Sequence, residues 1–353
     1  MKLQENIPLA PLTTFKVGGP ARYFVEADSE PDVRSAVAWA GERKLPSFVL
    51  GGGSNLVISD SGFQGLVLKV GLRGISKRDG SGKTIFDVAA GEDWDKFVAE
   101  TVTQNCAGIE CLSGIPGTVG GTPVQNVGAY GQEVANTITS VRVLDLEQNE
   151  IRELANPDLG FTYRTSIFNT AHRGRFIVLR VTYSLTPGGT PHIEYADLKK
   201  HFAGKLSPSV AETRDAVRRI RHSKAMLIVP DDPDCRSAGS FFKNPILPLE
   251  KYGEIADATR KRGISADVPK FPAANGHVKL SAAWLVEQSG FHKGFSRGPV
   301  GISSKHALAI VNRGGAKAAD IVTLKKEIEQ RVWDQFGVRL HPEPVFVGFE
   351  PAR

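Results

Sequence analysis

Three polar side chains lie in sequence surroundings that suit acid, base or charge-stabilising chemistry. Arg164 stands among aromatic and hydroxyl residues, where a guanidinium is pre-positioned for a carboxylate. Ser240 lies between a glycine and two phenylalanines, and without a GxSxG elbow it suits proton donation rather than acyl transfer. Glu343 lies between two prolines, where loss of water contact would suit its carboxyl group to acid work. The structural alternatives are a salt bridge, a turn serine and an exposed turn acid.

Two glycine-rich runs could bring backbone N–H groups close to a phosphate. The first, at residues 51–55, follows an apolar strand and ends in a serine and an asparagine that add side-chain donors. The second covers residues 114–121, where Pro116 and Gly117 suit the first turn of a helix whose N-terminus faces an anion. Two such loops could hold one dinucleotide between two lobes. A simple tight turn remains the alternative for the first run, although a turn needs fewer glycines.

Other nucleotide and metal motifs are excluded by their spacing. Neither loop has the GxGxxG of a Rossmann fold. The run at residues 80–84 imitates a P-loop, but Lys77 occupies its first glycine position and a strand follows, so we expect a hairpin turn. The 3 cysteines lack CxxC spacing and predict reduced thiols. The 8 histidines lack HExxH spacing, so we predict no metal site.

The elements that must position these residues mix helices and strands along the chain. Apolar runs and alternation predict strands at residues 21–27, 47–50, 66–70, 84–90, 138–146, 150–154, 176–185, 307–311 and 344–348. Amphipathic periodicity and capping residues predict helices at residues 29–43, 93–105, 210–224, 249–262, 281–289 and 320–336. This order predicts an α+β protein whose opening segment is a β-α-β unit.

The composition favours a soluble protein whose basic balance has two readings, a solvated basic surface or a polyanionic partner. A length of 353 residues predicts two or three domains, and the net charge of +6 suits polyanionic partners. The densest basic run lies on the helix expected at 210–224, but few aromatics interleave it, which argues against nucleic acid. The N-terminus lacks a signal peptide and no apolar run is long enough to span a bilayer, so we expect an intracellular location.

Taken in order, several segments resemble the UDP-N-acetylenolpyruvoylglucosamine reductase family. They are TTFKVGG at 13–19, GGGSNL at 51–56, the glycine run at 114–121, NVGAYG at 126–131, YRTSIF at 163–168, GSFFKNP at 239–245, SKHAL at 304–308 and the Pro-Glu pair at 342–343. Together they extend over nearly the whole chain. One departure is Pro344, where the family usually has a branched aliphatic residue.

The resemblance implies a vanillyl-alcohol-oxidase-type fold with two FAD-binding lobes and a C-terminal α/β substrate domain. The first lobe is expected at residues 1–70 together with 335–353, the second at 71–222 and the substrate domain at 223–334. The implied activity transfers hydride from NADPH through non-covalent FAD to UDP-N-acetylglucosamine enolpyruvate, giving UDP-N-acetylmuramate for peptidoglycan synthesis. We expect a cytoplasmic monomer that binds this UDP-sugar and NADPH, with no metal, nucleic-acid or membrane partner.

The resemblance also implies roles for single residues. Arg164 and Glu343 would flank the substrate carboxylate and stabilise negative charge, and Ser240 would donate a proton. The segment at 194–198 resembles a tyrosine-bearing loop that closes over the substrate. The expected substrate-binding residues are Tyr195, Lys224, Asn244 and Gln288. The expected FAD-binding residues are Gly51, Gly52, Gly53, Ser54, Asn55, Gly114, Ile115, Pro116, Gly117, Thr118, Gly120, Gly121, Asn126, Gly128, Ala129, Tyr130 and Ile177.

Two rival functions remain open from the sequence. An oxidase of small alcohols or lactones on the same FAD fold would bind flavin and consume oxygen, without any need for Arg164, Ser240 and Glu343 together. A basic nucleic-acid-binding protein would carry no flavin and would bind DNA with a steep salt dependence. The absorption spectrum of the purified protein separates the flavoproteins from the nucleic-acid-binding protein.

Overall fold

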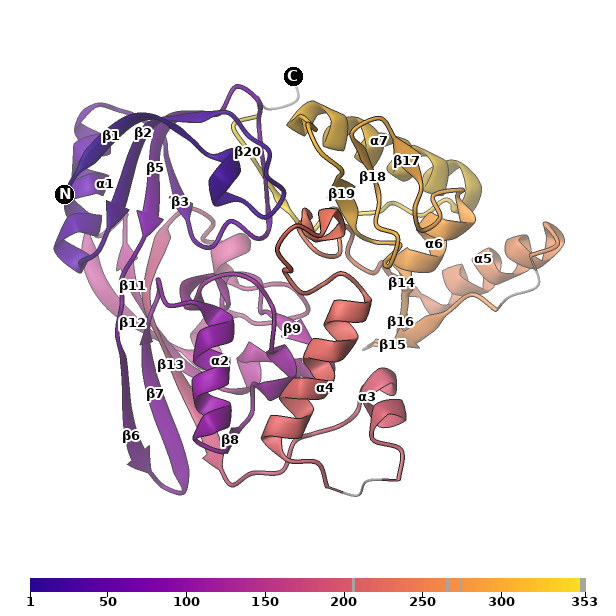
Figure 1. The fold of residues 1–353 in the computed structure, drawn as a ribbon, viewed down its shortest axis with the longest axis horizontal. Helices are drawn as coiled ribbons and strands as arrows, with labels where there is room; N and C mark the ends of the chain where they lie inside the picture. The colour runs from indigo at the N-terminus through magenta and orange to yellow at the C-terminus, as the bar shows by residue number, and fades with distance from the viewer. Residues whose placement is uncertain (205–206, 265–266, 274, 350–353) are drawn as a thin grey trace. The chain divides into compact units, whose positions relative to one another are not determined.

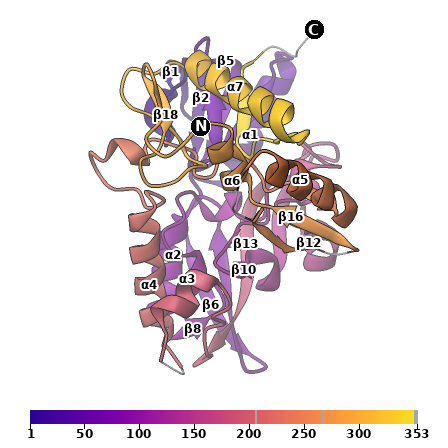
Figure 2. The ribbon, with the colours of Figure 1, turned by 90° about the vertical axis from the view of Figure 1, so that its right-hand side faces the viewer.

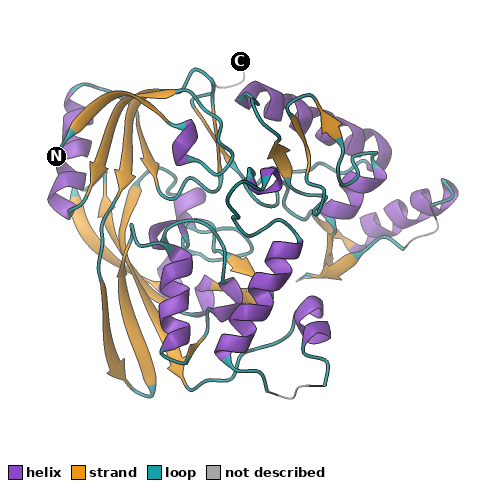
Figure 3. Cartoon of the chain, in the orientation of Figure 1, coloured by secondary structure: helices purple, strands orange, loops and turns teal. Residues whose placement is uncertain are grey.

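A computed structural model describes residues 1–204, 207–264, 267–273 and 275–349. These residues form two compact units, the first from 1–7, 21–53 and 63–228, the second from 8–20, 54–62 and the chain from 229 onward. Helices and strands are mixed in both units, which confirms the α+β class (Figure 3). The predicted division into three domains stays a prediction, and its ranges also include residues 205–206, 265–266, 274 and 350–353, which lie outside the described part.

The first unit begins with a four-stranded sheet in the order β1-β2-β5-β3. Its strands are β1 (Leu3–Pro8), β2 (Pro20–Ala27), β3 (Ser47–Leu50) and β5 (Phe63–Val70). Both β2 and β3 run parallel to β5, and helix α1 (Glu30–Glu42) connects β2 to β3. Ser29 caps α1 by accepting a hydrogen bond from the Asp32 N–H, which confirms the predicted start of the β-α-β unit. Strand β3 ends where the first glycine loop begins.

A second, antiparallel sheet completes the framework of the first unit (Figure 1). Its strands are β6 (Ile75–Gly80), β7 (Lys83–Ala89), β8 (Cys106–Ala107), β11 (Ile138–Asp145), β12 (Glu150–Ala155) and β13 (Phe176–Pro187). Ser81 and Gly82 connect β6 to β7 with φ values of 52° and 73°, the left-handed pair typical of a type I′ hairpin. The P-loop-like run is therefore a hairpin turn, as predicted.

Helices α2 (Trp94–Thr103) and α4 (Val210–Ser223) lie side by side in the first unit (Figures 1 and 2). Helix α3 (Ala196–His201) contacts α4, and β9 (Gly128–Ala129) pairs with β10 (Gln132–Glu133). The face of α2 that carries Trp94 and Phe97 is buried in aromatic packing. The ring of Phe97 lies 5.7 Å from that of Phe86 and 5.2 Å from that of Tyr183. Aromatic burial of this kind is a strong local contribution to stability.

The helix expected to open at Pro116 and Gly117 is wrong. The structure has only a 3-10 turn at Val119–Gly121 after this point. Gly114 and Gly117 have φ values of 73° and 139°, which no right-handed helix contains. Other short 3-10 turns of the first unit lie at Glu110–Leu112, Val134–Asn136, Asn156–Leu159 and Ile167–Asn169.

The described residues of the second unit form three small sheets and three α-helices. Its strands are β4 (Leu56–Ile58), β14 (Ile246–Pro248), β15 (Lys270–Pro272), β16 (His277–Leu280), β17 (Ser296–Arg297), β18 (Val300–Ile302), β19 (Ile310–Asn312) and β20 (Val345–Val347). Its helices are α5 (Leu249–Lys261), α6 (Ala282–Gln288) and α7 (Ala318–Phe336), with 3-10 turns at Ala10–Leu12 and Pro233–Cys235. Strand β20 pairs in parallel with β4, so the terminal segment returns to residues far earlier in the chain.

The strand expected at residues 307–311 begins only at Ile310. A turn precedes it, because the N–H groups of Leu308 and Ala309 donate back to His306. Among the described residues, no helix combines the length and the apolar character needed to cross a membrane.

Candidate functional site

The two predicted glycine loops meet at backbone level inside the first unit. A Cβ atom added to Gly52 would lie 2.5 Å from the Cα of Gly117, and one added to Gly51 would lie 2.9 Å from the Oγ1 of Thr118. No side chain fits at Gly52 without displacing backbone. Residues 51–53 and 117–118 therefore form one continuous backbone surface.

Several N–H groups of that surface make no backbone hydrogen bond within the described part of the chain. They belong to Gly51, Gly52, Gly53, Ile115, Gly117 and Thr118. Clusters of such N–H groups on glycine-rich loops bind phosphates. Ser54 and Asn55, the rest of the first predicted loop, belong to the second unit.

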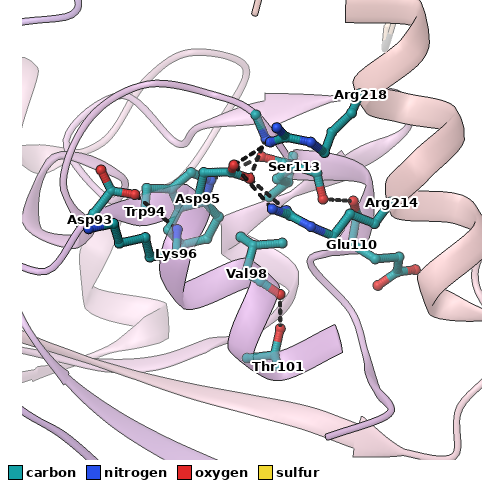
Figure 4. A network of polar contacts seen from close by, with 12 residues as sticks. Asp93, Trp94, Asp95, Lys96, Val98, Thr101, Glu110, Ser113, Arg214 and Arg218 are labelled. Atoms are coloured by element: carbon teal, nitrogen blue, oxygen red, sulfur yellow. Dashed lines mark hydrogen bonds and ion pairs between the residues drawn. The ribbon is translucent and has the colours of Figure 1, made fainter. Parts of the chain in front are cut away.

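The second glycine loop is fixed by an acidic residue that the sequence analysis did not single out. Asp95, in the first turn of α2, accepts a hydrogen bond of 2.6 Å from the N–H of Gly114. Its carboxylate also binds the guanidinium of Arg214 through both oxygens, at 2.6 and 3.1 Å, and that of Arg218 at 2.5 Å. Figure 4 shows Asp95 between these two arginines of α4. We call Asp95, Arg214 and Arg218 the arginine clamp.

Further contacts from α2 and the aromatic core fix the same loop. Trp94 donates its indole N–H to the carbonyl of Leu112 at 3.0 Å and its backbone N–H to that of Gly117 at 3.1 Å. The hydroxyl groups of Thr122 and Tyr183 lie 2.7 Å apart in the core. The loop thus packs against α2 and the aromatic core. These contacts fix its backbone and therefore pre-organise its N–H groups.

Electrostatics around the clamp follow from burial and pairing. Burial raises the pKa of Asp95, but the hydrogen bonds from Arg214 and Gly114 outweigh it and the pKa lies below its ordinary value. Burial lowers the pKa of Arg221, whose side chain is only 8% exposed and whose Nε has no hydrogen-bond partner. Arg221 lies against Gly114, since a Cβ on that glycine would be 3.4 Å from its Nε. The basic run on α4 is thus largely engaged inside the protein.

Three predicted ligand residues of the first unit come together near the end of α4. The rings of Tyr130 and Tyr195 pack edge to face at 5.2 Å, and the Nζ of Lys224 lies 6.0 Å from the Tyr195 ring. Asp197 binds Lys224 at 2.5 Å. Partial burial lowers the pKa of Lys224, but the hydrogen bond and the charge of Asp197, together with the nearby tyrosines, raise it above its ordinary value. Tyr195 is 42% exposed, so its face is open to a ligand.

Arg164 occupies the tip of a tight turn in the first unit. Thr162 and Thr165 form the bridge at its base, and Arg164 has a φ of 55°, which is unusual for a residue with a side chain. Its guanidinium donates to the carbonyl of Gly128 at 2.7 Å. Arg164 therefore lies beside the predicted FAD-binding residues Gly128 and Ala129.

Ser240 and Glu343 lie on paired segments of the second unit. The N–H of Glu343 donates to the carbonyl of Phe241 at 2.8 Å, and Phe242 bridges to Pro342 in antiparallel fashion. Both Ser240 and Glu343 are half-buried. The structure thus brings together the backbone segments that carry these two predicted catalytic residues, although they stand about a hundred residues apart in sequence.

The remaining predicted residues lie in defined surroundings. Asn55 donates its side-chain amide to the carbonyl of Glu343 at 3.2 Å, and Asn244 accepts from the Ala282 N–H at 2.9 Å. Asn244 therefore lies at the start of α6 and Gln288 forms its last residue. Ile177 is 2% exposed in the core of the first unit. Within the described residues, no group of three or more histidine, cysteine or acidic residues is arranged to hold a metal.

The arginine clamp had one signal in the sequence. Arg214, Arg218 and Arg221 recur at helical spacing, so one face of α4 is basic. Their acidic partner stands 119 residues from Arg214, where no local pattern could identify it.

Comparison with known families agrees with this geometry. Residues 21–155 match a family model described as an FAD binding domain. Residues 231–347 match a model described as the C-terminal domain of UDP-N-acetylenolpyruvoylglucosamine reductase. The predicted FAD-binding fold is thereby confirmed.

Relatives extend the likeness over the whole chain. Proteins named UDP-N-acetylenolpyruvoylglucosamine reductase from Streptomyces coelicolor and Thermobifida fusca are 46% and 43% identical, each over 98% of this chain and over 90% and 98% of the relative. The crystal structure of the reductase of that name from Thermus caldophilus has a TM-score of 0.65 at 25% identity. It covers 98% of this chain and 99% of the other.

Proposed function

The chain belongs to the family of UDP-N-acetylenolpyruvoylglucosamine reductases, and on that basis we propose how its residues carry out the family's reaction. The resemblance drawn from its motifs is confirmed. It is an FAD-containing oxidoreductase that takes its reducing equivalents from NADPH. Its reaction reduces the enolpyruvyl group of UDP-N-acetylglucosamine enolpyruvate to give UDP-N-acetylmuramate. The observation that carries the site assignment is the backbone surface at Gly52 and Gly117, inside the region that matches FAD-binding domains.

The two glycine loops fit the pyrophosphate of FAD. The N–H groups of Gly51, Gly52, Gly53, Ile115, Gly117 and Thr118 supply donors, and the lack of a side chain at Gly52 lets the two loops approach closely enough to present these donors together. The buried guanidinium of Arg221 adds positive charge beside Gly114. The loops contain no histidine or cysteine that could form a covalent flavin bond, so we assign non-covalent binding. Purified protein is expected to be yellow and to release FAD on acid precipitation.

FAD, when bound, supplies the hydride relay from NADPH to the terminal vinyl carbon of the substrate. Negative charge then develops on the adjacent carbon and spreads into the substrate carboxylate. We assign stabilisation of this charge to the guanidinium of Arg164 and to Glu343 as a protonated carboxyl group, each preorganised donor of this kind contributing roughly 3–4 kcal/mol. We assign protonation of the carbon to the hydroxyl group of Ser240. The backbone pairing of the Phe241 and Glu343 segments supports a fixed arrangement of Ser240 and Glu343.

Substrate binding is assigned to four further residues. Tyr195 and Lys224 lie together at the end of α4, where a phenol and an ammonium group suit the diphosphate of the UDP-sugar. Asn244 and Gln288 lie at the two ends of α6 and offer amide groups to the same ligand. The net charge of +6 suits two phosphate-bearing ligands that bind in turn.

The test of the reaction is NADPH oxidation by the purified holoenzyme, with and without the enolpyruvyl UDP-sugar. Oxidation is expected to require the UDP-sugar. Rapid oxidation with oxygen alone would instead identify an oxidase.

A sharper test separates the two half-reactions in the variant Ser240→Ala. NADPH bleaching of the flavin places no proton on a substrate carbon, so it should proceed at a near-normal rate. Reoxidation by substrate should slow by ~10²–10⁴-fold, the usual cost of losing a general acid. Anaerobic stopped-flow absorbance measures both. Equal slowing of both halves would assign Ser240 a structural or binding role, and no slowing would transfer proton donation to Glu343.

The product is a precursor of peptidoglycan, so we place the protein in cell-wall synthesis and, through it, in cell shape and division. We assign it to the cytoplasm, where NADPH and UDP-sugars are available, and propose that it acts as a monomer. Fractionation and analytical ultracentrifugation test these two assignments.

A further inference from the structure

The hairpin that carries Arg164 is held in an unfavourable backbone conformation. Thr162 and Thr165 exchange backbone hydrogen bonds of 3.1 Å in both directions, which leaves Tyr163 and Arg164 as a two-residue turn. Arg164 has a φ of 55°, in the left-handed region that a residue with a Cβ seldom adopts. Such a conformation persists only where neighbouring contacts impose it.

Asn126 supplies a contact at the base of this hairpin. Its side chain is 1% exposed, and its amide nitrogen donates to the carbonyl of Thr162 at 3.0 Å and to the carboxylate of Glu133 at 2.9 Å. The amide oxygen accepts from the N–H of Ala135 at 3.1 Å. Both amide donors and the oxygen thus have protein partners, and the chemistry of those partners fixes which end of the amide is nitrogen.

Two further links join the same two segments. The hydroxyl of Ser166 donates to the carbonyl of Val124 at 2.6 Å, and the guanidinium of Arg164 donates to the carbonyl of Gly128 at 2.7 Å. Asn126 is the middle link, and its side chain reaches the neck of the hairpin at Thr162 from the neighbouring segment. It also has a left-handed φ of 45°, which asparagine tolerates better than most residues.

We propose that Asn126 is a positioning residue for Arg164, fixing the hairpin against residues 124–128, rather than a ligand of FAD through its side chain. A side chain whose two donors are already bonded inside the protein has none to offer a flavin. Its loss would leave Arg164 present but displaced, and displacement of a preorganised group by about 1 Å costs on the order of 100-fold in rate. This inference rests on the proposed function, because it uses the role assigned there to Arg164.

The variant that tests it is Asn126→Gly. Glycine keeps the left-handed backbone and deletes all three hydrogen bonds of the side chain. In anaerobic stopped-flow with the holoenzyme, reoxidation by the enolpyruvyl UDP-sugar is expected to slow about 10- to 100-fold. Reduction by NADPH should change much less. A second variant, Asn126→Asp, keeps the shape and removes both donors, and it should show the same split between the half-reactions.

The control variant is Asn149→Gly. Asn149 is exposed and has a φ of 52°, so the substitution repeats the backbone change without the buried hydrogen bonds. Both half-reactions should match those of the unmodified protein. A thermal unfolding curve on each variant shows whether it is folded, and if Asn126→Gly is unfolded, Asn126→Asp carries the test.

A double-mutant cycle with Arg164→Gly shows whether Asn126 affects the reoxidation rate through Arg164. If Asn126 acts through Arg164, adding Asn126→Gly to Arg164→Gly should slow reoxidation by less than twofold, about 0.4 kcal/mol on the rate scale. Full additivity, equal slowing of both half-reactions or loss of FAD from Asn126→Gly would overturn the proposal. Failure of the proposed function appears separately, as an unmodified protein whose reduced flavin the UDP-sugar does not reoxidise.

Discussion

The second glycine loop, residues 114–121, and the segment around Tyr195 both lie against helix α4, but they are held in different ways. The loop is fixed by Asp95, which binds two arginines and a loop N–H, and by bonds from Trp94 to the carbonyls of Leu112 and Gly117. Tyr195 and Lys224 depend on one edge-to-face ring contact and one ion pair, with more than a third of Tyr195 exposed. Regions with few buried contacts open at low free-energy cost, so we expect the second glycine loop to be the more rigid region and the segment around Tyr195 the more adaptable one.

The largest effect is expected from breaking the rigid region with Asp95→Ala. The change leaves two arginines facing each other without an anion and removes the acceptor of the Gly114 N–H. The free energy of unfolding should fall by about 2–4 kcal/mol, and FAD should bind more weakly. Urea unfolding and flavin fluorescence titration measure the two effects. The matched control is Asp93→Ala, which removes only the cap of the same helix and should cost about 1 kcal/mol. Equal costs for the two variants would show that the clamp adds nothing to an ordinary helix cap.

The charge of Asp95 should also appear in the pH dependence of stability. Because the folded-state pKa of Asp95 is lowered, its stabilisation is fully present above its unfolded pKa of about 4 and is lost as pH falls through the folded pKa. The difference in unfolding free energy between the unmodified protein and Asp95→Asn should therefore be constant near neutral pH and shrink below about pH 4. Urea titrations at a series of pH values check this. A difference that grows on acidification would contradict the assigned pairing.

A smaller effect, confined to substrate binding, is expected from Tyr195→Phe. The substitution keeps the ring contact with Tyr130 and removes one hydroxyl, so the UDP-sugar should bind more weakly by about 0.5–3 kcal/mol. The melting temperature should stay the same. Tyr23→Phe, on a half-buried tyrosine of β2, serves as the control. Unfolding of the Tyr195→Phe protein would identify Tyr195 as a core residue and remove the contrast between the two regions.

The smallest effect on stability is expected from Asp197→Asn. The side chains of Asp197 and Lys224 are each about a third or more exposed. Exposed ion pairs of this kind contribute about 0–1 kcal/mol to stability. Loss of the carboxylate should lower the pKa of Lys224 toward its ordinary value. Thermal unfolding at low and high salt measures the stability change. A loss as large as that of Asp95→Ala would mean that the segment around Tyr195 is as rigidly held as the second glycine loop.

Local patterns were sufficient for most of the elements. Strand β3 and the hairpin between β6 and β7 lie where apolar alternation and turn residues predict them. The α+β class, the FAD-binding fold and the family are confirmed. Each of these predictions depends either on residues that are neighbours in sequence or on motifs that occur in a fixed order along the chain.

The errors have a common physical origin. Proline and glycine at 116–117 predict a helix start, but the glycines adopt positive φ values because the loop must bond Asp95 and Trp94 instead. The clamp itself was missed because its partners come from two separate helices. The paired segments of Ser240 and Glu343 meet through backbone hydrogen bonds, which carry no sequence signature. The roles of Arg164, Ser240 and Glu343 stay predictions.

The pairing of β20 with β4 has a consequence for biosynthesis. Asn55, next to β4, bonds Glu343, next to β20, across 288 residues of sequence. At ordinary translation rates the ribosome needs about 15–60 s to make the chain between them. During that interval β4 has no partner strand, and its exposed edge can recruit another chain. Chaperone demand during synthesis should therefore concentrate on the second unit, whose earliest residues must wait for its last ones.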